Sequence, residues 1–209
     1  MQKFIITISR EYGSGGRLIG KLLAQDLEIP FYDDEIRSRT AEKSGLSEDF
    51  IAKSAENLPN TFLHNLNYSA YSSYDSISFY DIPVTDKLFL AQSEVIKELA
   101  ALGSCVIIGR CADFVLRDEP GLVQVFIRGT LEDRIKFAVE NYGLSPQKAS
   151  EKLKKIDKSR TNYYKYYTNR QWGSIDNFDL IINTSFTGID GAVAIIKAML
   201  REKKEFQCL

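Results

Sequence analysis

The sequence has few of the residues that build metal centres and disulfide frameworks. Its 209 residues include one histidine, His64, and three cysteines, Cys105, Cys111 and Cys208. One histidine leaves no room for a multi-histidine metal site. The cysteines are odd in number and lie outside any paired metal-ligand spacing, as is typical of reduced thiols in a cytosol. We therefore expect no disulfide, no zinc site and no other dedicated metal site.

The chain also lacks a long apolar run and an excess of either charge. No segment approaches the ~20 apolar residues of a membrane span, and the apolar run near the N-terminus is too short for a signal peptide. Lysine and arginine total 27 against 28 aspartates and glutamates, so no global field attracts nucleic acid or an anionic membrane. We expect a cytoplasmic protein without nucleic-acid or membrane partners, folded as one domain over residues 1–209.

What the chain does contain is a regular alternation of strand-like and helix-like patterns. Residues 3–9 form a nearly continuous apolar run rich in β-branched side chains, as expected for a strand covered on both faces of a parallel sheet. A glycine cluster follows, and the apolar positions of 17–27 then recur at helical spacing. Further strands are predicted at 29–32, 105–109, 123–128 and 179–183, and further helices at 87–102 and 189–205. Strands that alternate with helices predict an α/β fold, with a parallel sheet and helices on both faces.

Two segments depart from this alternation. Residues 34–56 have a helical pattern, but 57–86 are rich in tyrosine, serine and asparagine, which indicates a long loop or a short irregular helix. The tyrosines of this segment are expected either to stack on the base of a ligand or to pack onto the core; they include Tyr68, Tyr71, Tyr74 and Tyr80. Residues 146–170 hold eight lysines or arginines against two acidic residues. That pattern suits a mobile basic lid, a solvated helix face, or an RNA- or protein-binding module.

A glycine-rich turn, Gly13-Ser14-Gly15-Gly16, joins the first predicted strand to the first predicted helix. The backbone N–H groups of such a turn converge on an anion because no Cβ blocks the approach. The helix that follows adds its free N–H groups and its positive dipole end. A plain structural turn also needs glycines, but these features together favour phosphate. We therefore expect Gly13, Ser14, Gly15 and Gly16 to bind nucleotide phosphates.

Two arginines flank this turn. Arg17 lies in the first turn of the helix, where a cation is disfavoured by about 0.3–1 kcal/mol against the helix dipole unless an anion is bound. Arg10 enters the same turn from the end of the strand. The two guanidiniums either clamp a phosphate or pair with Glu11 or a nearby aspartate.

Four motifs span nearly the whole length of the chain: ITISREYGSGGR at 6–17, IPFYD at 29–33, IIGRCAD at 107–113 and INTS at 182–185. In sequence and in order, they resemble the motifs of the cytidylate kinase-like family. The parent group, the nucleoside monophosphate kinases, implies a three-layer P-loop fold with a five-stranded parallel sheet, an acceptor-binding insertion at 34–86 and a basic lid at 145–173. The resemblance also implies ATP-dependent phosphoryl transfer to a nucleoside monophosphate or similar small phosphorylated acceptor, with Mg²⁺ entering on the nucleotide.

Asp33 and Arg110, carried over by position, resemble acceptor-side residues of cytidylate kinases. Asp33 would hold a sugar hydroxyl or help a metal, and Arg110 would grip the monophosphate. The alternatives are a helix cap for Asp33 and a surface ion pair for Arg110. The lid residues implied to contact the transferring phosphates are Lys158, Arg160 and Lys165, with Arg134 as a lid-base residue or an ion-pair partner.

The turn departs from an ordinary P-loop at several places. An ordinary loop ends in Gly-Lys-Ser or Gly-Lys-Thr, whereas the last two places here hold Gly16 and Arg17. Arg10 replaces the first glycine of the loop, and Ile108 replaces an aspartate of the cytidylate kinases. The chain therefore lacks both the phosphate-binding lysine and the hydroxyl that binds magnesium.

These departures leave two interpretations. In the first, Arg10 or Arg17 supplies the missing charge from another direction, and the catalytic residues are Arg17, Arg110, Lys158 and Arg160. In the second, the protein binds a nucleotide or another phosphate but transfers nothing. The sequence leaves the oligomeric state open, a homo-oligomer included.

Overall fold

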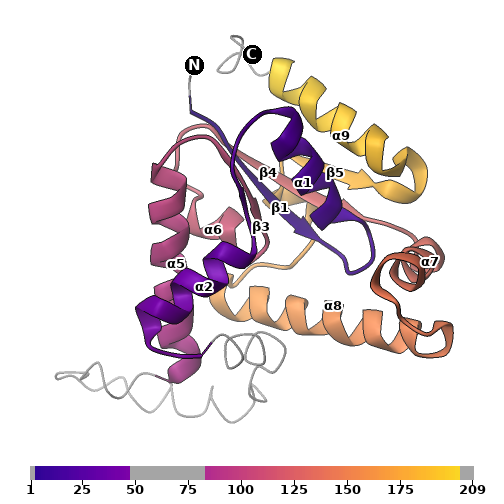
Figure 1. The fold of residues 1–209 in the computed structure, drawn as a ribbon, viewed down its shortest axis with the longest axis horizontal. Coiled ribbons are helices and arrows are strands. Elements are labelled where there is room, and N and C mark those ends of the chain that lie inside the picture. Colours follow the sequence, from indigo (N-terminus) through magenta and orange to yellow (C-terminus); the bar gives the residue numbers. More distant parts are fainter. Residues whose placement is uncertain (1–2, 48–82, 203–209) are drawn as a thin grey trace.

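The computed structural model describes residues 3–47 and 83–202, which form a five-stranded parallel sheet between two layers of helices (Figure 1). The strand order is β2-β3-β1-β4-β5, so β1 is central. The strands are β1 (Ile5–Arg10), β2 (Phe31–Tyr32), β3 (Cys105–Ile108), β4 (Leu122–Arg128) and β5 (Leu180–Asn183). All neighbouring pairs are parallel. The expectation of a parallel sheet with helices on both faces is confirmed.

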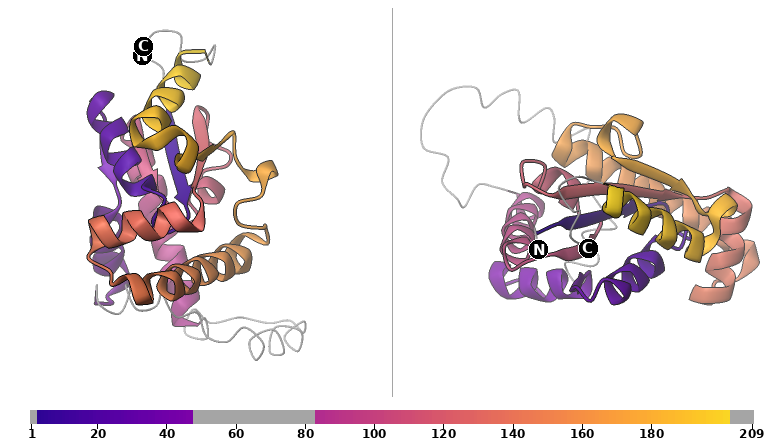
Figure 2. Two further views of the ribbon diagram at one scale, coloured as in Figure 1. Left: turned by 90° about the vertical axis from the view of Figure 1, so that its right-hand side faces the viewer. Right: turned by 90° about the horizontal axis from the view of Figure 1, so that it is seen from above.

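Helices cover the two faces of the sheet and its carboxyl edge (Figure 2). α1 (Gly16–Asp26) and α9 (Thr184–Glu202) pack on one face. On the other face lie α2 (Asp34–Ser44), α5 (Val84–Ala101) and the short α6 (Ala112–Val115). Two further helices, α7 (Leu131–Tyr142) and α8 (Pro146–Thr168), follow β4. In the ranges that the structure describes, no helix has the length and apolar character to cross a bilayer.

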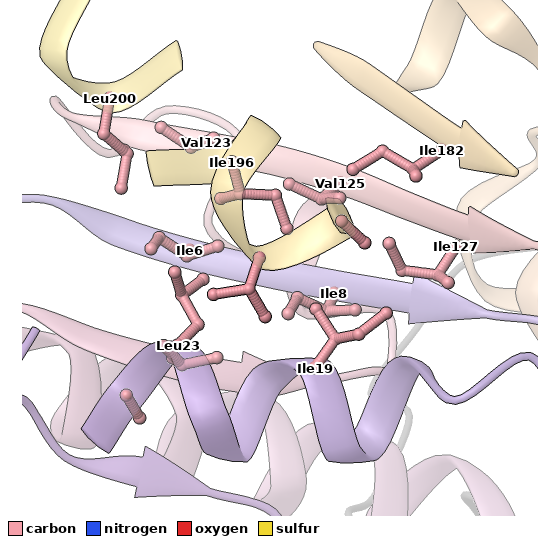
Figure 3. Close-up of a cluster of buried hydrophobic side chains, with 14 of the residues drawn as sticks. Ile6, Ile8, Ile19, Leu23, Val123, Val125, Ile127, Ile182, Ile196 and Leu200 are labelled. Atoms are coloured by element: carbon pink, nitrogen blue, oxygen red, sulfur yellow. The ribbon is translucent and has the colours of Figure 1, made fainter. Parts of the chain in front are cut away.

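β1 supplies side chains to the hydrophobic core on both faces of the sheet. Ile6 and Ile8 lie between the sheet and the two helices of the first face, where they meet Leu23 and Ile196 (Figure 3). Ile5 belongs to the opposite cluster, with side chains from β3, α2 and α5. All three isoleucines of β1 are fully buried. This two-sided burial explains the apolar run that predicted the strand.

α2 is shorter than its sequence pattern suggested. The helix expected over 34–56 ends at Ser44, because Gly45 takes a left-handed φ of 69°. The N–H of Gly45 then donates to the carbonyl oxygen of Ala41 and closes the last turn. The expectation of one helix through Gly45 is therefore wrong, and residues 48–56 lie outside the described part of the chain.

α9 begins earlier than the apolar pattern indicated. Its first turn starts at Thr184, whereas the expected helix started at Ile189. The early turn carries no apolar repeat, because its single large apolar residue, Phe186, is exposed, and the backbone leaves helical geometry at Gly188 before the apolar stripe begins. Several residues singled out in the sequence lie outside the described ranges: His64, Tyr68, Tyr71, Tyr74, Tyr80 and Cys208.

α8 runs beneath the sheet at its carboxyl edge, with Arg160 reaching the last residue of β1 (Figure 1). Its first half packs against α7 through Ala149 and Leu153. Near its end the ring of Tyr167 stacks on Phe89 of α5, with 4.0 Å between the ring centroids. The carboxyl edge is where open α/β sheets bind ligands, so α8 borders the expected site.

Candidate functional site

The glycine turn leads from β1 into α1 through two left-handed glycines. Gly13 and Gly15 have φ of 80° and 77°, a region that other residues rarely adopt. A Cβ at Gly13 would lie 2.5 Å from the carbonyl oxygen of Arg134, and a Cβ at Gly15 would collide with Ile189. These glycines therefore also allow close packing on α7 and α9. The amides at the start of α1 have no acceptors within the helix, as at any helix N-terminus.

Arg10 crosses the start of α1. A Cβ at Gly16 would lie 2.6 Å from the Cβ of Arg10, so the stem of Arg10 fills the space that a side chain at position 16 would need. Its guanidinium reaches the end of β3, where a Cβ at Gly109 would collide with Nη1 of Arg10. Arg10 thus carries a positive charge past Gly16, the residue that stands where an ordinary P-loop has its lysine.

The end of β3 presents Arg110 on a left-handed turn. Gly109, Arg110 and Cys111 have φ of 63°, 58° and 55°. The N–H of Ala112 donates to the carbonyl oxygen of Gly109 at 3.0 Å and closes the turn. Such a conformation costs about 1–2 kcal/mol for each non-glycine residue, and strain of this kind is concentrated at functional sites. Arg110 Nη1 donates to Oε1 of Gln92 at 3.1 Å, which fixes the guanidinium.

Arg10, Arg110 and Arg160 form one group of positive charges, the arginine cluster. Arg160 of α8 donates from Nη1 to the carbonyl oxygen of Arg10 at 2.9 Å, and its guanidinium lies 5.5 Å from the ring centroid of Tyr12. Burial, and next the charge of Arg160, lower the pKa of Arg10 to about 9, so Arg10 stays charged at neutral pH. Burial also lowers the pKa of Arg110 and of Arg160. Like charges in such poorly solvated surroundings are stabilised by an anion.

Asp33 lies beside the arginine cluster and binds Arg17. Its carboxylate accepts from Nε of Arg17 at 2.5 Å, while Nη2 of Arg17 donates to Asp34 at 2.9 Å. The hydrogen bond to Asp33 raises the pKa of Arg17. Asp33 is the N-cap residue of α2, yet its side chain makes no capping hydrogen bond. Of the two roles left open for Arg17, the structure shows the pairing with aspartates.

A second group, the Asp157 network, joins the turn to α7 and α8. Asp157 accepts from the backbone N–H of Tyr12 at 2.8 Å and from Nη1 of Arg134 at 2.7 Å. The same nitrogen of Arg134 lies 3.4 Å from Oε2 of Glu11, which accepts from the N–H of Gly129 at 3.0 Å. Arg134 is buried, and its Nε has no partner among the described residues. A buried donor without a protein acceptor costs free energy, which a bound water or a polar ligand group would recover.

A cavity of about 240 Å³ opens between the turn, α7 and the start of α9. Its lining residues are Gly13, Ser14, Asp133, Arg134, Lys136, Phe137, Glu140, Thr184, Ser185, Gly188 and Ile189. Arg134 belongs both to this wall and to the Asp157 network. The volume lies somewhat below the ~300–1,000 Å³ range of small-molecule sites, and the wall combines hydroxyls, charges and an aromatic ring.

The structure brings some of the predicted site residues together and separates others. Those that converge are Arg10, Arg110, Arg160 and Asp33. Lys158 and Lys165 are exposed. Lys158 is two positions from Arg160, so the two side chains leave α8 on different faces. The hydroxyl of Ser14 lies 2.9 Å from the carbonyl oxygen of Glu11 and so helps to close the turn.

Sequence reasoning missed Asp157, Gln92 and Tyr163. Asp157 is one of two acidic residues in the basic segment 146–170, and its spacing to Arg160 places both on one helix face. That combination is a signal that could have found it. Gln92 Nε2 donates to the hydroxyl of Tyr163 at 3.2 Å and so braces the arginine cluster from α5. No local pattern connects these two residues, because they lie far apart in the chain.

Residues 5–186 match the model of the cytidylate kinase-like family. The chain is similar to an uncharacterized protein from Eubacterium ventriosum ATCC 27560, with a TM-score of 0.70, 27% identity, and 96% of this chain and 100% of that chain covered. It is also similar to shikimate kinase from Bacteroides thetaiotaomicron, with a TM-score of 0.53, 13% identity and coverage of 95% and 98%.

A second shikimate kinase, from Acinetobacter baumannii in complex with shikimate, matches with a TM-score of 0.52, 14% identity and coverage of 98% and 96%. At these identities the two kinases show the fold alone, which is the three-layer α/β fold of P-loop kinases. A search of curated proteins found no match.

Proposed function

The chain belongs to the cytidylate kinase-like family, and we propose that it transfers a phosphoryl group from ATP to a nucleoside monophosphate or a similar small phosphorylated acceptor. Family and fold support phosphoryl transfer of the kinase type. The observation that carries the proposal is the arginine cluster, in which Arg10, Arg110 and Arg160 meet at the carboxyl edge of the sheet.

The position of the cluster supports phosphate binding. β1 and β3 are neighbours, but the helices that follow them, α1 and α6, pack on opposite faces of the sheet. Such a switch point opens a crevice outside the carboxyl ends of the strands, where ligands of open α/β sheets bind. A guanidinium binds two phosphate oxygens through paired N–H donors. Phosphoryl transfer depends mainly on positioning and on preorganised positive charge that stabilises the phosphate oxygens.

The cationic donor set fits a polyphosphate in spite of the missing lysine. Arg10 passes over Gly16 and would supply the charge that the lysine supplies elsewhere, while bound ATP provides the γ-phosphoryl group. Position 17 offers no hydroxyl to magnesium. Within residues 3–47 and 83–202, no group of three or more acidic, histidine or cysteine side chains could hold a metal ion. In this proposal Mg²⁺ therefore arrives with the nucleotide.

The donor and the acceptor are assigned to opposite sides of the arginine cluster. We place the donor nucleoside in the cavity beside Arg134, with its phosphates on the turn from Gly13 to Gly16. On the acceptor side, Asp33 would hold a sugar hydroxyl and Arg110 the acceptor phosphate. Part of the assigned insertion, 34–86, lies outside the described residues, so the base-stacking role of its tyrosines stays a prediction.

Binding of a nucleotide or phosphate without transfer is a second candidate function. Two observations favour it. The chain lacks both the lysine and the hydroxyl of an ordinary loop, and Asp157 accepts the hydrogen bond of the Tyr12 N–H directly before the turn. Calorimetry that shows tight ATP binding independent of magnesium, together with no turnover, would support this second function.

A coupled assay that follows ADP formation from ATP over a panel of nucleoside monophosphates tests the transfer. We expect turnover with at least one acceptor. Arg110→Met should lower kcat/KM by about 10²–10³, because a group that stabilises the transferring phosphate is lost. Arg117→Met removes an exposed arginine that pairs with Asp118, and it should leave kcat/KM unchanged. Absence of turnover for every acceptor, by folded protein, rejects the transfer.

A further inference from the structure

Asp157 places a carboxylate at the entrance of the glycine turn that is proposed to bind phosphate. One of its oxygens accepts from the N–H of Tyr12 at 2.8 Å, and the other accepts from Nη1 of Arg134 at 2.7 Å. Tyr12 directly precedes Gly13, the first glycine of the turn. The Asp157 side chain is 17% exposed, so water competes little for these donors. The structure therefore shows a carboxylate of the chain itself bound to the N–H that directly precedes the turn.

A carboxylate and a phosphate would compete for this pair of donors. Both are anionic acceptors that bind backbone N–H groups and guanidiniums. They repel each other strongly where solvent is scarce, so a polyphosphate on the turn and a carboxylate at Tyr12 disfavour each other. Arg134 also keeps a buried Nε without a partner among the described residues, which gives an incoming phosphate a donor that Asp157 does not use.

α8 has attachments on both sides of Asp157 that do not involve this carboxylate. Toward its start, Leu153 is fully buried in a cluster with Ala138 of α7. Toward its end, the hydroxyl of Tyr164 donates to Asp113 at 2.6 Å. The Asp157 side chain can therefore leave the turn while the helix stays in place.

We propose that Asp157 is an internal anion that occupies the phosphate-binding turn in the absence of nucleotide and is displaced by the polyphosphate of the donor. The inference rests on the proposed function in one respect, that the turn binds donor phosphates. With an intramolecular competitor, the apparent affinity is the intrinsic affinity multiplied by the fraction of molecules in which the competitor is not bound. It also favours multiply charged ligands, since a singly charged anion brings no more charge than the carboxylate that it replaces.

Isothermal titration calorimetry with inorganic tripolyphosphate tests this displacement in the wild type, Asp157→Asn and Glu151→Gln. The first variant keeps the shape of the side chain and removes its charge. The second removes the same charge from an exposed position of α8, outside the network. We expect Asp157→Asn to bind tripolyphosphate about tenfold more tightly, and Glu151→Gln to stay within about twofold of the wild type.

Thermal stability gives a second readout, in which Asp157→Asn is expected to lose stability although it gains affinity. Without ligand, Asp157→Asn should melt at a lower temperature than the wild type, because Arg134 then lacks a charged partner on α8. A purely structural role for Asp157 would lower stability without raising affinity. If Asp157→Asn is too unstable for calorimetry, Tm is measured at increasing concentrations of tripolyphosphate instead. The inference then requires a larger rise in Tm for the variant than for the wild type.

Equal or weaker binding by Asp157→Asn overturns the inference, and so does the absence of tripolyphosphate binding by both proteins. Binding by the variant alone supports it. Tighter binding by Asp157→Asn together with no turnover in the kinase assay rejects the proposed transfer and keeps the displacement. Equal affinities together with normal turnover reject the displacement and keep the transfer.

Discussion

Gly16 and Arg10 are a matched pair, because one leaves the space that the other fills. A Cβ at position 16 would lie 2.6 Å from Cβ and 3.0 Å from Cγ of Arg10. An ordinary P-loop carries the opposite arrangement, with a glycine at the first place and a lysine near the end. In this chain the cationic residue, Arg10, lies on the strand side of the turn, and the lysine position on the helix side holds Gly16. A lysine restored at position 16 alone would therefore meet the stem of Arg10.

Gly16→Ala should lower the free energy of unfolding by about 1–3 kcal/mol, the usual cost of overpacking. In an Arg10→Gly background the same substitution should cost less than about 1 kcal/mol, because, of the three nearest contacts, only the 3.3 Å contact with Cβ of Ile127 then remains. Chemical denaturation of the wild type, both single variants and the double variant gives the coupling energy. Gly191→Ala in α9 is the matched control, since its Cβ would make an ordinary 3.4 Å contact with Thr187. If the effects of the two substitutions on the free energy of unfolding are additive, the side chains at positions 10 and 16 do not compete for the same space.

At the scale of elements, a buried carboxyl connects α6 to α8. Asp113 lies in the first turn of α6, and the hydroxyl of Tyr164 on α8 donates to its Oδ2 at 2.6 Å. The other oxygen of Asp113 has no hydrogen-bond partner among the described residues. Burial raises the pKa of Asp113, and this effect exceeds the opposing effect of the hydrogen bond from Tyr164.

This raised pKa gives stability a definite pH dependence. The folded state binds the proton of Asp113 more tightly than the unfolded state, so the contribution of this group is most favourable below its ordinary pKa of 3.8. It declines as the pH rises from that value through the raised folded pKa. Asp113→Asn keeps an acceptor for Tyr164 and carries no charge. We expect it to raise Tm at pH 8 and to flatten the loss of Tm between pH 4 and pH 8.

Thermal melting at several pH values checks this expectation, with Asp118→Asn as the control. Asp118 is an exposed carboxylate in the loop after α6, so its substitution should leave the pH profile close to that of the wild type. A lower Tm for Asp113→Asn at pH 8 would mean that the charged form of Asp113 is favoured in the folded protein.

Helices and strands with strong apolar patterns were predictable from the sequence. The ends of helices that depend on single residues were not. The apolar run of β1 and the helical spacing of α1 gave both elements close to their observed bounds, because burial decides both. The end of α2 depends on one glycine in a left-handed conformation, which a helical pattern does not show. The start of α9 has no apolar repeat and makes tertiary hydrogen bonds, with Thr184 donating to the carbonyl oxygen of Ser14.

At the scale of the whole molecule, the candidate site was predictable as far as the sheet determines it. Parallel strands bring their carboxyl ends to one edge, so the turn after β1 and Arg110 after β3 were expected there. The position of α8 was not predictable from local pattern, and Arg160 and Asp157 depend on it. The charge pattern of α8 marked a basic helix, but it did not show that one arginine turns inward while Lys158 stays exposed.

The chain as a whole has a formal charge of −1, yet the arginine cluster concentrates positive charge at one edge. Any ligand that binds the folded state alone stabilises it, by about 2.7 kcal/mol at 100 times its dissociation constant. Inorganic phosphate at that level should therefore raise the Tm of the wild type by roughly 5–10 °C, at about 2–4 °C per kcal/mol for a chain of this size. Sodium chloride of equal ionic strength should produce little of this gain.

Arg110→Met separates binding at the cluster from a general salt effect. The substitution removes one of three mutually repelling charges, so in chloride the variant should melt above the wild type, while phosphate should raise its Tm by less than half as much. Arg117→Met should match the wild type in both buffers, because this exposed arginine pairs with Asp118 away from the cluster. A full phosphate gain in Arg110→Met would place the anion elsewhere. A lower Tm in chloride would mean that the hydrogen bond from Arg110 to Gln92 outweighs the repulsion within the cluster.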